Sequence, residues 1–223
     1  MDQKKVLEGI EKLHTAEIIL IISSVLSILG LIVLLASDRA LNPDELAVTD
    51  PTTSGIVWML ILEIAAVVLA VISNILNVVA LKRAKDGDVL FKPGFYISIM
   101  MLIIFIISGF GVSNEESLFA GIIEILEELG ELALMVIIIT GLKKFITKFG
   151  GDRMLRFANI MRALVAIMLA LSLIGAILHL TGLEFVESIK VASYVFSLVS
   201  FILYLIFVAR AIKFLKRNIE RGG

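Results

Sequence analysis

The sequence contains no cysteine, only two histidines and only three prolines among its 223 residues. The absence of cysteine excludes disulfide bonds, thiol catalysis and cysteine-ligated metals. The histidines, His14 and His179, lie far apart in the chain and show no metal-ligand spacing. The sequence therefore identifies no cofactor and leaves metal binding open.

Common enzyme signatures are missing as well. There is no H-E-x-x-H, no G-x-S-x-G, no glycine-rich phosphate loop, and no aspartate within the long apolar segments. Zinc hydrolysis, serine catalysis, nucleotide binding and an intramembrane aspartate dyad would each need one of these patterns. Glu127 and Glu128 form a carboxylate pair, but no nearby histidine or arginine completes a hydrolytic set. We therefore predict that the protein is not an enzyme.

Apolar residues, by contrast, are abundant. Hydrophobic residues make up 59 % of the chain and charged residues 18 %, against about 45–50 % and 25 % in soluble domains. Six apolar segments are each close to the ~20 residues that a helix needs to cross a bilayer. They are Glu17–Ala36, Ile56–Leu81, Phe95–Val112, Leu118–Leu142, Ala158–Leu180 and Val191–Ala209. The sequence predicts an all-α polytopic membrane protein, a bundle of six transmembrane helices.

This pattern divides the chain into three parts. Residues 1–15 form a cytoplasmic or interfacial segment, residues 16–212 the transmembrane domain, and residues 213–223 a basic cytoplasmic tail. In the first part, Val6, Ile10 and Leu13 share one helical face, which suits either a helix on the membrane surface or a solvated start to the first span. The first apolar segment lacks a small-residue cleavage site, so we expect it to be retained.

The distribution of lysine and arginine predicts the orientation. The N-terminus, the second and fourth loops and the C-terminus carry 18 of the 20 cationic residues, and the other three loops carry only Arg39 and Lys190. Because cationic loops stay in the cytoplasm, we predict a multi-pass protein of the cell membrane with both termini inside. Anionic lipid is the partner expected at the basic face, which needs no nucleic acid to explain it.

A weak internal repeat links the second and fourth segments. Glu63 precedes Lys82 by 19 residues, and Glu124 precedes Lys143 by the same 19 residues. The pattern is consistent with three helical hairpins of one ancestral type, all in the same orientation. Chance similarity between apolar sequences is the alternative.

One stretch also carries a resemblance. Asn77-Val78-Val79-Ala80-Leu81-Lys82-Arg83-Ala84-Lys85, followed by Phe91-Lys92-Pro93-Gly94-Phe95, resembles a broad group of six-helix membrane proteins from anaerobic Gram-positive bacteria. The likeness covers most of the chain and includes the short charged start and the basic final helix. It implies the six-helix architecture. The group has no established activity, so the resemblance transfers no functional residues.

The fourth segment carries the most unusual chemistry. Glu124, Glu127, Glu128 and Glu131 are spaced 3, 1 and 3 residues apart, which places all four within an arc of about 100° on one helical face. Carboxylates in hydrocarbon are costly and normally face protein or water. The segment from Leu132 to Leu142 has no charge and ends at Lys143 and Lys144.

Two interpretations of this face remain open. With Lys143 at the inner interface, Glu131 lies about 18 Å away, just beyond the middle of a core about 30 Å thick. The glutamates, joined by Glu63, would then line a hydrated, cation-attracting vestibule open to the outside. Alternatively the helix sits further out, with Phe145, Ile146 and Phe149 at the inner interface and the glutamates near the outer headgroups as an extension hinged at Gly130.

Other polar residues within the segments suggest helix packing. Asn74 and Asn77 share one side of the second segment, where hydrogen bonds between helices are the usual role. Arg162 lies about one turn inside the fifth segment, and Glu17 lies at the same depth in the first as a candidate ion-pair partner.

The glutamate face favours a small-molecule or cation transporter or channel-type protein, or the membrane subunit of one. A first alternative is the substrate-capture subunit of a modular vitamin importer, similar in size, helix number, terminus placement and a longer first outer loop. A second alternative is a non-transporting assembly protein that binds a partner through small-residue helix faces. A homo-oligomer or a membrane-protein partner fits each of these functions.

Overall fold

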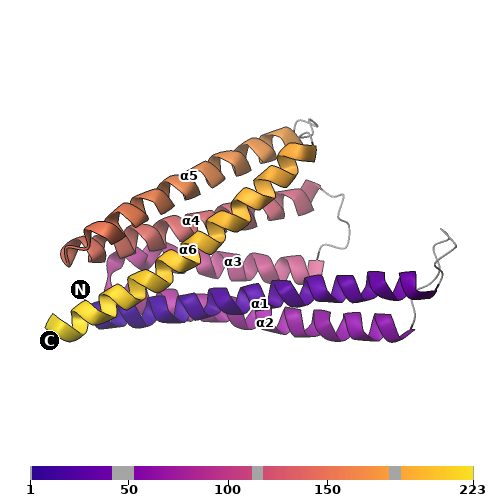
Figure 1. Cartoon of the computed structure of the whole chain (residues 1–223), viewed down its shortest axis with the longest axis horizontal. Coiled ribbons are helices and arrows are strands. Elements are labelled where there is room, and N and C mark those ends of the chain that lie inside the picture. The colour runs from indigo at the N-terminus through magenta and orange to yellow at the C-terminus, as the bar shows by residue number, and fades with distance from the viewer. Residues whose placement is uncertain (1, 42–52, 112–117, 181–186, 223) are drawn as a thin grey trace. The chain divides into compact units, whose positions relative to one another are not determined.

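The computed structural model describes residues 2–41, 53–111, 118–180 and 187–222. These residues form six long helices and one short 3-10 helix (Figure 1). The helices are α1 (Gln3–Leu41), α2 (Thr53–Gly87), η1 (Val89–Phe91), α3 (Lys92–Gly111), α4 (Leu118–Lys148), α5 (Asp152–Leu180) and α6 (Glu187–Gly222). The all-α prediction is confirmed. Each helix extends beyond its predicted apolar segment at the end that carries lysine and arginine, because the polar residues there continue the helical turns.

Five of the helical segments are long and apolar enough to cross a membrane. They are Gln3–Ala36, Gly55–Gly87, Val89–Ser108, Asp152–Ser172 and Leu198–Arg221. The chain is therefore an integral membrane protein. Helix α4 is not among the five, because its four glutamates and three lysines leave more than two charged residues in any stretch long enough to cross.

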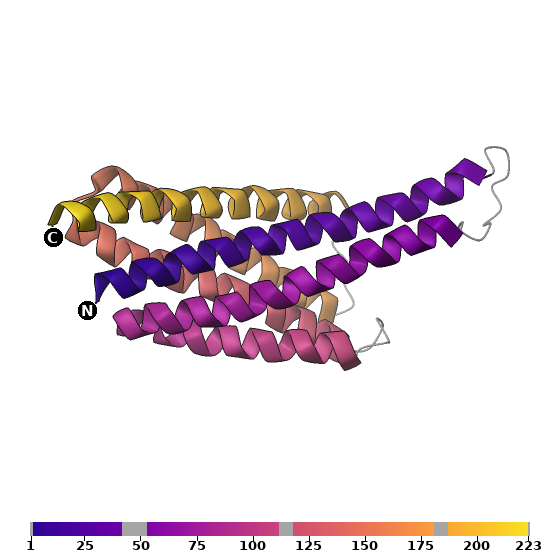
Figure 2. The same ribbon diagram turned by 90° about the horizontal axis from the view of Figure 1, so that it is seen from below.

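The chain divides into two units, of which Thr15–Asn77 is one. Here α1 and α2 run side by side in both views (Figures 1 and 2). Large apolar side chains cover their outer surface; Ile28 is 58 % exposed and Ile64 is 63 % exposed. Serines connect the two helices, since the Ser23 hydroxyl donates to the Ala66 carbonyl and the Ser73 hydroxyl to the Ala16 carbonyl, each at 2.8 Å. An apolar exterior with polar bonds between helices is typical of helices packed in lipid.

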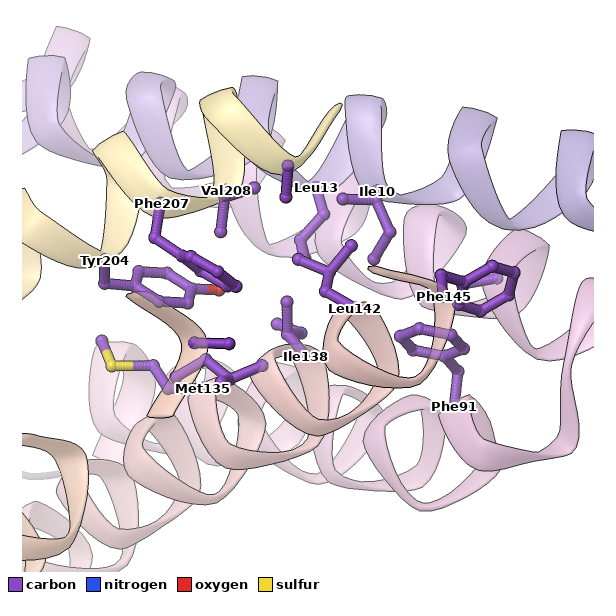
Figure 3. Close-up of a cluster of buried hydrophobic side chains, with 14 of the residues drawn as sticks. Ile10, Leu13, Phe91, Met135, Ile138, Leu142, Phe145, Tyr204, Phe207 and Val208 are labelled. Carbon is purple, nitrogen blue, oxygen red and sulfur yellow. The ribbon is translucent and has the colours of Figure 1, made fainter. Parts of the chain in front are cut away.

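The second unit comprises Met1–His14 and Val78–Gly223. In it α4 packs against α3, α5 and α6, and α5 packs against α6 (Figure 1). Side chains from α1, η1, α4 and α6 meet in its core, where Leu142 and Ile138 of α4 face Ile10, Leu13 and Val208 (Figure 3). Most of this core lies toward the end of the unit where the cationic residues are found.

The N-terminal segment belongs to this core. Val6, Ile10 and Leu13, the face that the sequence singled out, are at most 2 % exposed. Close packing is possible because Gly9 has no side chain: a Cβ there would lie 2.7 Å from the Ala80 carbonyl oxygen. The segment is the uninterrupted start of α1, and protein covers its apolar face.

Helix α4 passes through Gly130 without a break. Gly130 is buried, and a Cβ there would meet the Met101 side chain of α3. This glycine therefore provides space for a neighbouring helix, and the structure shows no helix end at the predicted hinge. Phe145 and Ile146, which one interpretation placed at the lipid interface, are buried in the core of the second unit.

Candidate functional site

The turn between α2 and α3 is anchored by Asp88. Its Oδ1 accepts a hydrogen bond from the Leu90 N–H at 2.9 Å, and its Oδ2 lies 3.0 Å from Lys144 Nζ of α4. The side chain of Asp88 is 7 % exposed. Burial by itself raises the pKa of this carboxyl, but the Leu90 N–H and the Lys144 ammonium outweigh burial and hold the pKa below its usual value. Asp88 therefore stays ionised and links α4 to the α2–α3 turn.

Two further ion pairs attach the start of α1 to the rest of the second unit. Arg83 donates from Nε and Nη2 to Glu8 Oε2 at 2.9 and 2.7 Å. Lys216 of α6 lies 3.4 Å from Glu11. All four side chains are more than a third exposed, so solvent screens each pair, which contributes little to stability and mainly sets the position of the segment.

The boundary between lipid and water can be located on α5 and α6. On α5 exposed Arg156 and Arg162 are followed, toward the C-terminus of the helix, by an uncharged apolar stretch that includes exposed Ile167. On α6 exposed Ile206 is followed by exposed Arg210. Because hydrocarbon excludes charge, this change on each outer face marks the edge of the apolar core.

Lys143 of α4 lies at the same level. Its Nζ donates to Oδ1 of Asn159 at 2.7 Å, and Asn159 is next to Ile160 in α5. At 1.5 Å per residue, Glu131 is about 18 Å from this level along α4, and Glu127 about 24 Å. In a core about 30 Å thick, Glu131 would lie just past the middle.

Within the glutamate face, the side chains have different surroundings. Oε1 of Glu127, which is partly buried, lies 3.0 Å from the hydroxyl of Ser108 on α3. That hydroxyl also lies 3.0 Å from the Ile104 carbonyl and has one proton to donate to either. Glu128 and Glu131 are exposed on the second unit. The side chain of Glu124 lies outside the described residues.

Glu63 has a similar serine partner in the unit Thr15–Asn77. The Ser27 hydroxyl of α1 lies 3.3 Å from its Oε2. In both hairpins, α1–α2 and α3–α4, a serine on the first helix thus contacts a glutamate on the second. The described contact in α4 is made by Glu127, whereas the predicted repeat aligns Glu63 with Glu124, one turn earlier in the helix. The structure describes Glu63 and the α4 glutamates in separate units.

The residues predicted to help helices pack have varied environments. Asn74 Nδ2 donates to the Ala70 carbonyl of its own helix at 3.0 Å. Oδ1 of Asn77 is buried without a hydrogen-bond partner among the described residues. Glu17 is buried, and Arg162 is exposed. Glu17 and Arg162 belong to different units, so their pairing stays a prediction.

Sequence reasoning missed the serines and Asp88. Ser23 and Ser27 are four residues apart on one face of α1, which is a signal for contacts with a neighbouring helix. Asp88 precedes a short helical turn, the position where a carboxylate caps free N–H groups. Across the described ranges, no group of three or more histidine, aspartate or glutamate side chains is arranged to hold a metal ion.

These observations define an all-α integral membrane protein with carboxylates on a central helix. In comparisons with known proteins, no protein-family model matches the chain, and neither a curated protein nor a solved structure matches it.

Proposed function

We propose that the protein is a transporter or channel-type protein for a cation or a small molecule, or the membrane subunit of one. The observation that carries this proposal is Glu131, an exposed carboxylate about 18 Å along α4 from the level of Lys143. A carboxylate at that depth costs several kcal/mol against lipid. It needs a proton, water, a bound cation or polar groups around it, and a transport pathway supplies these.

The described cationic residues of the second unit are poorly placed to neutralise Glu131. Between Lys92 and Lys143 the sequence contains no lysine or arginine, and Arg162 lies close to the level where the outer face of α5 becomes polar. Glu127 and Glu128 add negative charge within one turn of Glu131. A mobile cation or proton is therefore the counter-charge that we propose, with Glu131 as the innermost carboxylate and Glu124 as the entry group.

The proposal includes a sixth span. Helix α4 has 31 residues, about 46 Å at 1.5 Å per residue, which is longer than a bilayer core is thick. With α4 crossing the membrane and both termini in the cytoplasm, the glutamates occupy the outward-facing half. The basic ends of α2, α4, α5 and α6 then lie on the cytoplasmic side.

Replacement of Glu131 tests this function. Glu131→Gln keeps the shape of the side chain, so the purified protein should fold with about the wild-type melting temperature. In wild-type protein, thermal stability should depend on pH and on added monovalent or divalent cations, and Glu131→Gln should remove that dependence. Proteoliposomes that contain a cation-sensitive dye should show an uptake signal that the variant loses.

Glu220→Gln is the matched control, because Glu220 is an exposed carboxylate in the last turns of α6, beyond the apolar part of the helix. It should behave as the wild type in both assays. Normal expression and melting temperature for Glu131→Lys would place the residue at an aqueous surface and remove the main support for transport.

A partner-binding assembly protein is the second candidate. It is favoured by Ala166 and Ala170, which are exposed four residues apart on α5 and would allow close approach of another helix. Co-purification distinguishes the two functions: a single stoichiometric membrane partner without cation-dependent stability supports assembly. Co-purification with an ATPase-containing module would instead support the vitamin-importer alternative.

A further inference from the structure

The outer faces of α5 and α6 bring several cations together where these helices meet. Exposed Arg153 and Arg156 lie in the first turns of α5, and exposed Arg210, Lys213 and Arg217 lie in the last turns of α6. The spacings of three and four residues on α6 place its three cations on one helical face. The opposite face of α6, with Val208 and Leu215, is buried.

Two contacts show that the cations of α5 and those of α6 lie at matching levels along the two helices. The Arg210 guanidinium carbon lies 5.9 Å from the centre of the Phe157 ring on α5. Phe157 in turn contacts Phe207 of α6 edge to face, with ring centres 5.4 Å apart. The ring of Phe157 is thus fixed between the helices, and its contact with Arg210 brings that guanidinium close to the turn of α5 that carries Arg156.

The charges in this region are unbalanced. The carboxylates nearest in sequence to these five cations are two, Asp152 and Glu220. A further cation, Lys216 on the neighbouring face of α6, is paired with Glu11. On the same outer faces, one turn toward the apolar part, lie Ile160, 57 % exposed, and Ile206, 40 % exposed. An anion that binds here therefore has an apolar surface directly beside it.

We propose that Arg156, Arg210 and Lys213 form a binding site for the phosphate of an anionic phospholipid, whose acyl chains lie along the exposed isoleucines of α5 and α6. Arginine suits this ligand because its planar guanidinium can donate two parallel hydrogen bonds to one phosphate group. The apolar surface next to the cations favours a lipid over a soluble phosphate. The site is independent of the α4 glutamates, so it does not rest on the proposed transport function.

Lipid binding by the full-length protein in neutral detergent tests this site. Phosphatidylglycerol, added in mixed micelles, should raise the melting temperature and remain bound in native mass spectra, and phosphatidylcholine should do neither. Each cation near an anionic lipid surface accounts for about a fivefold change in affinity. The double variant Arg156→Gln/Arg210→Gln should therefore bind phosphatidylglycerol roughly 25-fold more weakly.

Lys216→Gln is the matched control, because it removes one positive charge from the same end of α6 but on the neighbouring face, where Lys216 pairs with Glu11 outside the proposed site. It should leave the affinity within about twofold of wild type, less than the fivefold change expected within the site. If Lys216→Gln and Arg210→Gln weakened the binding of phosphatidylglycerol equally, the affinity would come from the general positive potential of this surface. That result would overturn the proposed site. Unchanged binding by the double variant would also overturn it.

A third variant keeps the proposal testable if the double variant does not fold. Lys213→Gln changes one exposed side chain on α6. About fivefold weaker binding of phosphatidylglycerol is expected from this change, and wild-type affinity would contradict the proposal.

Discussion

Asp88 stabilises the α2–α3 turn through two interactions of one buried carboxylate. One oxygen caps η1 through the Leu90 N–H, and the other pairs with Lys144 on α4. Because Lys144 is half exposed, the ion pair itself contributes little, and the cap contributes about 1 kcal/mol. Removing the carboxylate would in addition leave the Leu90 N–H without its intramolecular acceptor.

We therefore expect Asp88→Ala to lower the free energy of unfolding by about 1–3 kcal/mol at neutral pH. Thermal unfolding in detergent measures this change. Asp86→Ala is the control, because Asp86 is exposed two residues earlier in the same turn, and it should change stability by less than about 0.5 kcal/mol.

The Asp88 contribution should also depend on pH. Its folded-state pKa is depressed, so the stabilisation is fully present above the pKa of the unfolded chain, about 3.9, and is lost as the pH falls through the folded-state value. The difference in stability between the wild type and Asp88→Ala should be constant from about pH 7 to 5 and shrink below about pH 4. A difference that grows on acidification would contradict the assigned ionic contacts.

At the scale of a helix, the start of α1 is a part of the protein core. Ile10 is fully buried among residues of α2, α4 and α6, and the close approach at Gly9 brings the backbone of α1 next to that of α2. A helix resting on a membrane surface would instead present this face to lipid.

We expect Ile10→Ala to cost about 2–5 kcal/mol of stability, the usual range for removal of a large buried aliphatic side chain. Thermal unfolding of the purified protein measures the loss. Ile28→Ala is the matched control in the same helix, since Ile28 is 58 % exposed on the unit Thr15–Asn77. Equal melting temperatures for the two variants would show that Ile10 is not packed in the core.

At the scale of the whole molecule, the distribution of charge predicts which side each loop faces. The natural absence of cysteine allows a single-cysteine labelling experiment without any background replacement. A cysteine at Thr49, which belongs to the predicted first outer loop and lies outside the described residues, should react with a membrane-impermeant reagent added to intact cells. A cysteine at Lys148, which is exposed at the end of α4, should react only after the membrane is opened.

Labelling of Lys148→Cys but not of Thr49→Cys in intact cells would reverse the predicted orientation. Labelling of both positions would place them on the same side of the membrane, which requires an even number of spans between them. The predicted topology has three, namely α2, α3 and α4, so this result would mean that α4 does not cross. The experiment thus tests the orientation and the membrane crossing of α4 together.

The sequence alone was sufficient for the helices and their general environment. Runs of about 20 apolar residues can satisfy their backbone hydrogen bonds in lipid only as helices or closed barrels, and the length of these runs favours helices. The spacing of Glu127, Glu128 and Glu131 likewise places them near one another, because in a helix this depends on local geometry alone.

Only the tertiary structure determined which surfaces are covered. In a membrane protein, lipid-facing and core-facing side chains are both apolar, so hydrophobic periodicity does not distinguish Ile10, which is buried, from Ile28, which is exposed. The partners of Ser108, Lys143 and Asp88 come from other helices. Such contacts depend on how helices distant in sequence pack together, and no local pattern specifies that packing.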